Sequence, residues 1–315
     1  MTRLIIVLAL GLLAVCSGAM APADLVTTFD GHRSAVNALD LAEDGTLYSA
    51  GKDGRLKLWD MNTNEMLTEI EACQTAINDV AVDPLTGSYF VTAGDDGWVK
   101  VWDSLTLELL QVIYAHDGPA NCVAIDREGL LIYSGGDDGY LRAYSVERDY
   151  ALDWEVHANF GGVNDVLENP YGGYVFACGV DGRVIGYTGA EGYLITDIQA
   201  IDNGEALCMA FSANEACLMV GGTDGNINWF DGTTGSRTHS MRAHAGDVNF
   251  IDFNNDQNLL VSGGADGKIK LWNRDAELAG EMQAHVLAVS DFVMNLDTLV
   301  TGGADFKIRV WDARF

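Results

Sequence analysis

Three observations predict an all-β fold assembled from seven copies of one four-stranded antiparallel unit. A short segment that ends near an aromatic residue recurs through the 315 residues at a spacing of about 42 residues. Within the copies, an Asp-Gly pair separates two short apolar runs. Finally, no stretch of the chain keeps the 3.6-residue apolar period of a helix.

The repeat is clearest in the last strand of each copy. This strand reads GRLKLWD in the first copy, GWVKVWD in the second and FKIRVWD in the seventh. The aromatic residues of the seven copies, in chain order, are Trp59, Trp102, Tyr144, Tyr187, Phe230, Trp272 and Trp311. Because chance does not hold a spacing over so many steps, each copy is one supersecondary unit.

A hairpin joins this strand to the apolar strand before it. Asp-Gly between apolar runs is a strong hairpin signal, because glycine adopts the positive φ of a tight turn without steric cost. The six Asp-Gly pairs begin at Asp53, Asp96, Asp138, Asp181, Asp224 and Asp266. The seventh copy has Asp305-Phe306, so we expect its turn to be strained or of another type.

A further strand precedes the hairpin and often opens with Val-Asn, as at Val36-Asn37 and Val163-Asn164. A four-stranded sheet that is apolar on both faces must bury both of them to be stable. Radial packing achieves this for every copy at once, because each sheet lies between two neighbours. The sequence therefore predicts a seven-bladed β-propeller.

These features resemble the WD-repeat family, on the residues Gly31-His32, the SxG-x-DG run and the closing pair Trp59-Asp60. We assign residues 20–315 to a single propeller domain. In that family each repeat supplies the outer strand of one blade and three inner strands of the next. The resemblance therefore implies that Leu25–Phe29 pairs with the last copy and closes the ring, which removes exposed sheet edges.

Ser, His and Asp recur at fixed spacing, as a hydrolase triad would require once. The resemblance implies instead a buried structural quartet, a hydrogen-bond chain from Trp through Ser or Thr and His to Asp. The complete quartets are His32/Ser49/Asp53/Trp59, His244/Ser262/Asp266/Trp272 and His285/Thr301/Asp305/Trp311, and a Tyr variant is His116/Ser134/Asp138/Tyr144. Because the set recurs, we expect no enzyme and no cofactor.

The remaining copies depart from the quartet. Cys73 takes the His place in the second copy, Ala177 the Ser place in the fourth, and the fifth has Val220 and no evident His. Since each net hydrogen bond contributes about 1 kcal/mol, we expect blades four and five to be the least stable. His239 and His244 have no third ligand nearby, so no metal is predicted.

Residues 1–19 are predicted to be a secretory signal peptide. Arg3 precedes the apolar run Leu4–Val15, and the small residues Ser17 and Ala19 favour cleavage after Ala19. The run is shorter than the roughly 20 residues that span a bilayer, which disfavours an uncleaved membrane anchor. We therefore expect a protein that is secreted or lies in the secretory-pathway lumen, without membrane insertion after cleavage.

Charge and cysteine content limit the function classes. The chain has 18 Lys and Arg against 46 Asp and Glu, a formal net charge of −28. Such a surface repels phosphate backbones and anionic lipids, so nucleic acid is not an expected partner. Four of the five cysteines that follow the leader lie in apolar stretches, which is typical of buried side chains rather than disulfides.

The resemblance also implies where partners dock: on the face where the Asp-containing turns meet the loops before the Val-Asn strands. The candidate contacts carried over are Asn37, Lys52, Asn78, Asp95, Asn121, Asp137, Asn164, Asp247 and Asn249. We expect a monomeric, non-catalytic scaffold for one or more proteins. Since the candidate positions hold no Trp, Tyr or Arg, the residue types favoured at hot spots, a polar or basic partner is expected.

Two alternatives stay open for this face. The Asn side chains could simply satisfy backbone groups at the strand ends. The Asn circle, together with Asp95, Asp137 and Asp247, could instead form a small-ligand site at the mouth of the central channel, binding calcium or a sugar, with or without catalysis.

Overall fold

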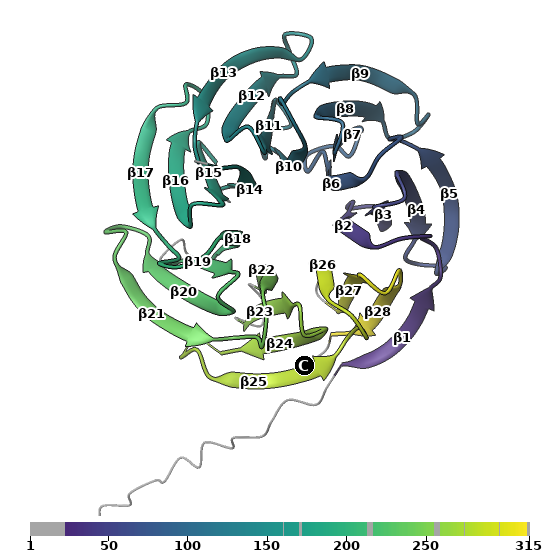
Figure 1. The fold of residues 1–315 in the computed structure, drawn as a ribbon. Helices are drawn as coiled ribbons and strands as arrows, with labels where there is room; N and C mark the ends of the chain where they lie inside the picture. The colour runs from purple at the N-terminus through teal and green to yellow at the C-terminus, as the bar shows by residue number, and fades with distance from the viewer. Residues whose placement is uncertain are drawn as a thin grey trace, which may run out of the picture.

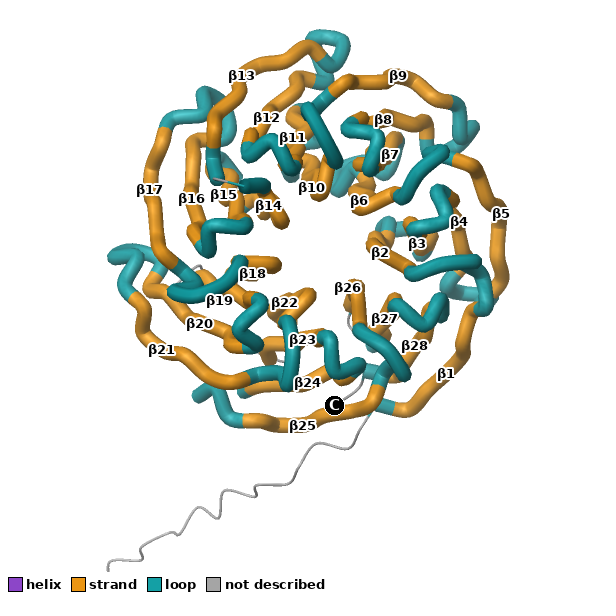
Figure 2. The backbone as a smooth tube through the Cα atoms, in the orientation of Figure 1, coloured by secondary structure: helices purple, strands orange, loops and turns teal. Residues whose placement is uncertain are grey.

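The computed structural model describes residues 23–159, 161–169, 172–212, 217–254, 259–273, 275–295 and 297–313. These residues form the strands β1 to β28, and none of them is helical. The strands make seven four-stranded antiparallel sheets arranged around a central axis (Figures 1 and 2). The predicted seven-bladed β-propeller is confirmed.

Each blade runs from an inner strand near the axis to an outer strand at the circumference (Figure 1). Blade one holds β2 (Val36–Leu41), β3 (Thr46–Gly51), β4 (Arg55–Asp60) and β5 (Glu65–Glu71), and blade two holds β6 (Ile77–Val82), β7 (Tyr89–Gly94), β8 (Trp98–Asp103) and β9 (Leu109–Tyr114). Blade three holds β10 (Ala120–Ile125), β11 (Leu131–Gly136), β12 (Tyr140–Ser145) and β13 (Ala151–His157), and blade four holds β14 (Val163–Glu168), β15 (Tyr174–Gly179), β16 (Arg183–Thr188) and β17 (Leu194–Gln199). Blade five holds β18 (Ala206–Phe211), β19 (Cys217–Gly222), β20 (Asn226–Asp231) and β21 (Arg237–Arg242), and blade six holds β22 (Val248–Asn254), β23 (Leu259–Gly264), β24 (Lys268–Trp272) and β25 (Leu278–Gln283). Blade seven holds β26 (Val289–Met294), β27 (Thr298–Gly303), β28 (Ile308–Asp312) and β1 (Asp24–Phe29).

The last blade closes the ring with strands from both ends of the described chain. β1 pairs antiparallel with β28, with Thr28 opposite Arg309. Phe29 of β1 also stacks on Trp59 of blade one, with ring centroids 4.6 Å apart and planes 10° apart. The predicted closure by Leu25–Phe29 is confirmed, because these residues join blade seven to blade one as well as completing the sheet.

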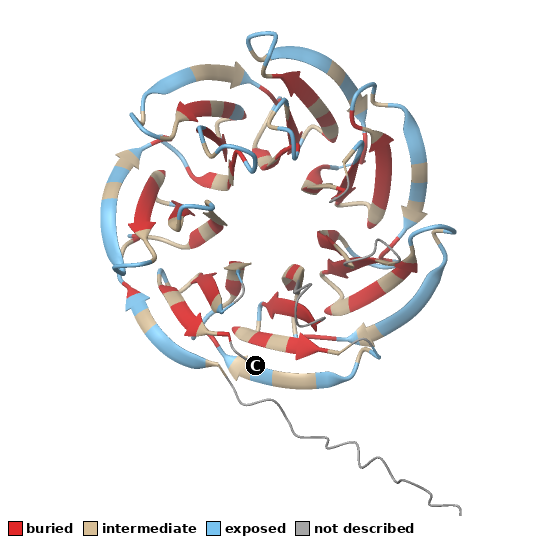
Figure 3. Cartoon of the chain, turned by 180° about the vertical axis from the view of Figure 1, so that it is seen from behind, coloured by how far each residue is buried: buried red, intermediate tan, exposed pale blue. Residues whose placement is uncertain are grey.

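The core lies between the blades. Each of seven clusters of buried apolar side chains combines residues from two neighbouring blades. Between blades one and two, for example, Tyr48 and Leu58 pack with Phe90 and Trp102. The middle strands are mostly buried and the outer strands mostly exposed (Figure 3). Each blade is therefore stable only between its neighbours.

Every inner strand contains one β-bulge. In blade one Val36 pairs with Gly51 and Ala38 with Ala50, so that Asn37 has no place in the register. The same shift falls on Asn78, Asn121, Asn164, Leu207, Asn249 and Ser290. A bulge residue is left unpaired and its side chain is re-aimed, which frees these positions to contact the next blade.

The Asp-Gly turns adopt the predicted conformation, with φ of 74° at Gly54. Glycine is also required there by a close approach, because the N–H groups of Ala72 and Cys73 donate to the Gly54 carbonyl. A Cβ at Gly54 would lie 2.2 Å from the Cys73 carbonyl oxygen. The chain entering the next blade thus packs directly onto the turn.

The seventh turn keeps this conformation without glycine. Phe306 has φ of 69°, so the expectation of a strained turn is confirmed. In the described structure neither Gly31 nor His32 donates a backbone bond to the Phe306 carbonyl, unlike the equivalent residues at the six other turns. The looser contact leaves room for a side chain.

The five described cysteines are free, and four of them are buried. Of the four in apolar stretches, Cys122, Cys178 and Cys208 are buried as expected, whereas Cys217 is only partly buried. The proposed signal peptide, residues 1–19, lies outside the described residues. Within the part of the chain that the structure describes, no helix has the length and hydrophobicity needed to cross a membrane.

Candidate functional site

The candidate contacts lie at one end of the ring, which we call the turn face. Here the turns between the second and third strands of each blade meet the connections that enter the inner strands. The N–H of Lys52 donates to the Ala35 carbonyl at 2.9 Å, and that of Asp95 donates to the Ala76 carbonyl at 3.0 Å. Equivalent bonds occur in all seven blades, so the two sets of loops form one continuous rim.

The quartets lie beneath this rim and form the chain that the resemblance implied. In blade six, Trp272 Nε1 donates to Ser262 Oγ at 2.9 Å, and His244 Nε2 lies 2.8 Å from the same oxygen. His244 Nδ1 lies 2.8 Å from Asp266 Oδ1. Blades one and seven repeat these contacts with Ser49 and Thr301 as the hydroxyl residues.

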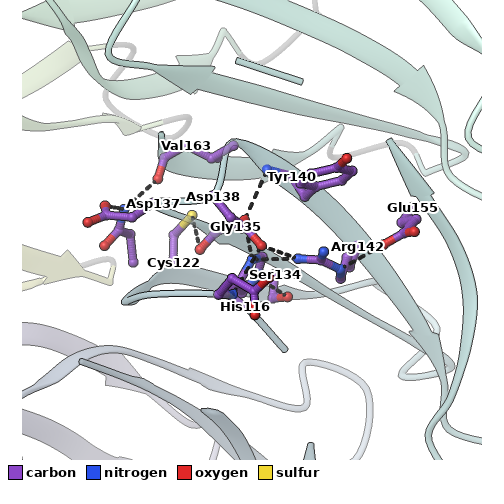
Figure 4. A network of polar contacts seen from close by, with 12 residues as sticks. His116, Cys122, Ser134, Gly135, Asp137, Asp138, Tyr140, Arg142, Glu155 and Val163 are labelled. Carbon is purple, nitrogen blue, oxygen red and sulfur yellow. Dashed lines mark hydrogen bonds and ion pairs between the residues drawn. The ribbon is translucent and has the colours of Figure 1, made fainter. Parts of the chain in front are cut away.

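In blade three, as in blade seven with Arg309, a cation also contacts the turn carboxylate (Figure 4). His116 bridges Ser134 and Asp138 at 2.8 Å each, and Arg142 donates to Asp138 at 2.7 Å and to Glu155 at 2.9 Å. Burial by itself would raise the pKa of Asp138, but the hydrogen bonds from Arg142 and His116 outweigh it and lower the pKa to about 2. The carboxylate is therefore held charged as a structural anchor.

The geometry of the quartets is that of a strand-to-strand network. The side chains of the four histidines are wholly shielded from solvent, with 0% exposure each. Burial lowers the pKa of all four, more than the neighbouring carboxylates raise it. Each histidine side chain thus joins a hydroxyl of the second strand to a carboxylate of the turn, shielded from a molecule on the turn face.

Blades two, four and five have other residues at the quartet positions. Cys73 Sγ lies 3.2 Å from Asp96 and takes the His place, as predicted. In blade four Asn159 takes the His place and donates to Asp181 at 3.0 Å, and Ala177 takes the Ser place, as predicted. In blade five Ile201 stands there: its N–H bonds the Gly182 carbonyl as His116 N–H bonds Gly97. Sequence reasoning missed Asn159 and Ile201, although both lie about 42 residues from a quartet His.

The five candidate Asn residues each join their own blade to the next one. The Nδ2 groups donate to the backbone carbonyl that opens the following inner strand: Asn37 to Ile77 at 2.8 Å, Asn78 to Ala120 at 3.0 Å, Asn121 to Val163 at 2.9 Å, Asn164 to Ala206 at 3.0 Å and Asn249 to Val289 at 2.7 Å. The alternative that these side chains satisfy strand-end backbone groups thus has direct geometric support. The bulge described above is what lets each amide reach across.

The candidate charged residues are more accessible. Asp95, Asp137 and Lys52 are exposed, and Asp247 is partly exposed. Asp95 accepts a hydrogen bond from Asn78 at 2.9 Å, and Asp137 accepts one from Asn121 at 2.8 Å. Among the described residues neither carboxylate has a cationic partner. Both carboxylates therefore remain available to a positively charged group.

Sequence reasoning missed an aromatic pair on the same face. Trp98 and Tyr114 are 40% and 64% exposed, and their rings meet edge to face with centroids 6.5 Å apart. Trp98 directly follows the Asp96-Gly97 turn, and Tyr114 ends the outer strand beside it. The candidate positions themselves hold no Trp, Tyr or Arg, but the turn face as a whole presents Trp98 and Tyr114.

The central channel opens at the opposite end of the ring as a cavity of 1670 Å³. Its walls include six carboxylates from the inner strands: Asp40, Asp79, Asp165, Glu168, Asp252 and Asp291. Most of them accept amide protons from the next blade, as Asp79 does from Val123 at 2.8 Å. Across the described residues, no group of three or more His, Cys, Asp or Glu is placed to hold a metal ion, so nothing in the geometry favours the calcium alternative.

The segments of the chain that match a known family correspond to individual blades. Residues 23–60, 64–103, 107–145, 235–273 and 276–312 match the sequence profile of the family described as WD domain, G-beta repeat. The unmatched stretch 146–234 contains all of blade four and most of blade five. These are the blades whose polar sets depart furthest from the quartet.

The chain resembles three curated proteins over part of their length. The WD repeat-containing protein 91 homolog of Dictyostelium discoideum is 30% identical over 148 residues, which is 45% of this chain and 19% of that protein. The WD repeat-containing protein 91 of Pongo abelii is 41% identical over 66 residues, 21% of this chain and 9% of that protein. The DENN domain and WD repeat-containing protein SCD1 of Arabidopsis thaliana is 23% identical over 257 residues, 79% of this chain and 21% of that protein. The chain spans between 9% and 21% of these relatives.

Proposed function

This chain belongs to the WD40 repeat family, and on that premise we propose that it is a non-catalytic scaffold whose turn face binds a protein partner. WD40 propellers typically bind proteins, and fold alone does not say which. The proposal therefore depends on the surface chemistry of this face. The observation that carries it is the set of turn-face carboxylates without cationic partners, Asp95 and Asp137 above all.

These carboxylates favour a basic or polar partner. Asn78 and Asn121, which hold them, are neutral donors, so a large part of each negative charge is uncompensated. A chain of net charge −28 attracts cationic surfaces over a Debye length of about 8 Å at physiological salt. Binding of this kind should weaken as salt concentration rises.

The test is partner capture after charge reversal. We expect a variant that combines Asp95→Lys, Asp137→Lys and Asp247→Lys to recover fewer of the partner proteins that proximity labelling marks in the native cell. The matched control reverses Glu43, Glu147 and Glu191, three exposed acids in turns at the opposite end of the blades. Unchanged recovery with the first set, in a protein whose circular dichroism is unaltered, would exclude the turn face.

We also propose that the scaffold acts in the secretory pathway or outside the cell, as a monomer. The support for this location is the pattern of residues 1–19, a basic start followed by an apolar run and small residues. N-terminal sequencing of the protein purified from its native source should begin at Met20. A first residue of Met1 or Thr2 would contradict export by cleavage.

A further inference from the structure

Blades two and three form a distinct sector of the turn face. In blades one to six the residue after the turn glycine lies opposite the end of the outer strand. In four of the other blades this pair contains a cation: Arg55 opposite Glu71, Arg183 opposite Gln199, Asn226 opposite Arg242 and Lys268 opposite Gln283. In blade seven Lys307 follows the turn and pairs with Asp30. Blades two and three have Trp98 opposite Tyr114 and Tyr140 opposite His157 instead.

Aromatic rings thus replace the cations that the other blades present. The Trp98 and Tyr114 rings are edge to face, which leaves the face of one ring uncovered by the other. In blade three a guanidinium already lies over an aromatic ring, with Arg142 Cζ 4.7 Å from the Tyr140 centroid. The second blade offers the same kind of aromatic surface, and among the described residues no cation–π contact involves Trp98 or Tyr114.

Acidic groups border the aromatic pair. Tyr114 donates its hydroxyl to Asp117 at 3.0 Å, and that hydrogen bond raises the pKa of the Tyr114 hydroxyl. Asp95 and Asp137 lie on the turns of blades two and three, exposed and without an ion pair among the described residues. The cations of this sector are already engaged, since Lys100 pairs with Asp96 and Arg142 with Asp138 and Glu155.

We propose that the sector formed by Trp98, Tyr114, Asp117, Asp95 and Asp137 binds a basic segment of the partner protein, with a Lys or Arg side chain seated against Trp98 and Tyr114. The aromatic surface attracts the cation through the ring quadrupole, and Asp117 lies beside it to meet the charge. Asp95 and Asp137 then receive further basic residues of the same segment. This inference rests on the proposed function and specifies the partner chemistry for it.

The experiment uses a peptide of alternating Gly and Arg as the probe and the same peptide with Gln in place of Arg. Titration calorimetry at physiological salt should show binding of the Arg peptide only. Trp98→Ala should weaken that binding about five- to tenfold, in line with the value of a cation–π contact, and Trp98→Phe should restore part of the loss. Asp117→Asn should weaken it too.

Two controls separate this site from general attraction to an acidic protein. Tyr193→Ala removes another exposed aromatic side chain, 68% exposed on the connection between β16 and β17, and should leave the affinity unchanged. Trp98→Ala does not alter the net charge, so equal affinities of the wild type and Trp98→Ala would overturn the inference. Equal losses with Asp117→Lys and Glu147→Lys would overturn it as well.

Partner capture distinguishes the two proposals. If charge reversal at Asp95, Asp137 and Asp247 abolishes capture while Trp98→Ala leaves it intact, the turn face still binds but the aromatic sector does not. If neither change affects capture, the proposed function itself fails.

Discussion

Phe306 holds a backbone conformation that glycine holds in the six other turns. A non-glycine residue at positive φ costs roughly 1–2 kcal/mol, and the side chain here is 45% exposed, so packing repays little of that cost. The residue is tolerated because the chain after β1 does not approach the turn as closely as elsewhere.

The first prediction concerns this strain. Phe306→Gly should raise the free energy of unfolding by up to about 1 kcal/mol, since the relief of strain exceeds the entropy that glycine adds to the unfolded chain. Urea unfolding measures the change. Phe306→Ala, which keeps the Cβ, should give no such gain, and equal gains with both variants would show that the ring rather than the backbone is responsible.

A second residue-scale prediction concerns the quartet hydroxyl. Ser262 is fully buried and bonds both Trp272 and His244, so Ser262→Ala leaves two polar groups without a partner. The loss should be about 2 kcal/mol in the free energy of unfolding, because orphaned buried groups cost more than the net value of their bonds. Ser240→Ala, at an exposed position of β21, serves as the control and should change stability little; a similar loss in both would refute the network.

At the scale of the blade, the polar set decides local stability. Among the described residues three buried side-chain atoms lack a hydrogen-bond partner, and two of them, Asn159 Oδ1 and Asn228 Oδ1, lie in blades four and five. The other blades have a cation at the position of Asn228, such as Lys57 or Arg142, and blade four has Ile185 there. Both blades have therefore lost the whole unit of His, hydroxyl and cation.

The third prediction follows from these deficits. Amide hydrogen exchange should be fastest around Phe176–Tyr187 and Met219–Phe230, because local opening there breaks fewer polar contacts. Mass spectrometry of peptides from all seven blades provides the comparison, with the equivalent strands of blades one and six as internal references. Uniform protection around the ring would refute it.

At the scale of the whole molecule, the inner strands surround the channel with carboxylates that join neighbouring blades. Burial raises the pKa of Asp79 to about 8, and the nearby Asp165 and Asp40 add to the effect; it raises the pKa of Asp40 and Asp165 to about 6. The folded protein therefore binds these protons more tightly than the unfolded chain does. Their contribution to stability is full below the ordinary Asp pKa of 3.8, falls as pH rises above it, and is lost once pH passes the folded pKa values of about 6 to 8.

The quartet histidines act in the opposite direction. Their folded pKa values lie below the ordinary value of 6.5, so the unfolded chain takes up protons first as pH falls. Their contribution is present above pH 6.5 and is lost below it. The two sets together favour greatest stability in a mildly acidic to neutral range.

The fourth prediction isolates the contribution of a channel carboxylate, Asp79, to the pH dependence of stability. Asp79→Asn mimics the protonated carboxyl, so it should reduce the fall in stability between pH 5 and pH 8 that the wild type shows. Urea midpoints at each pH give the slope. Asp297→Asn, an exposed position, should follow the wild type, and an Asp79→Asn slope equal to the wild-type slope would mean that Asp79 does not titrate in this range.

The sequence alone determined the fold, because a repeated unit with apolar faces has few ways to bury them. The spacing of Trp59 and its equivalents, the Asp-Gly turns and the Leu25–Phe29 strand predicted the blades and their closure, and the quartets followed from resemblance at fixed positions. These patterns are spacings along the chain, and such spacings can be read without knowing how the chain folds.

Only the tertiary structure decided what each surface residue contacts. The partners of Asn37 and Asn121 lie about 40 residues away on the next blade, and the sector around Trp98 and Tyr114 exists because β8 and β9 end side by side. The carboxylate of Asp165, two blades further along the ring, raises the pKa of Asp79 for the same reason. Contacts between blades depend on how the ring closes, and that closure brings together residues that no local pattern of the sequence connects.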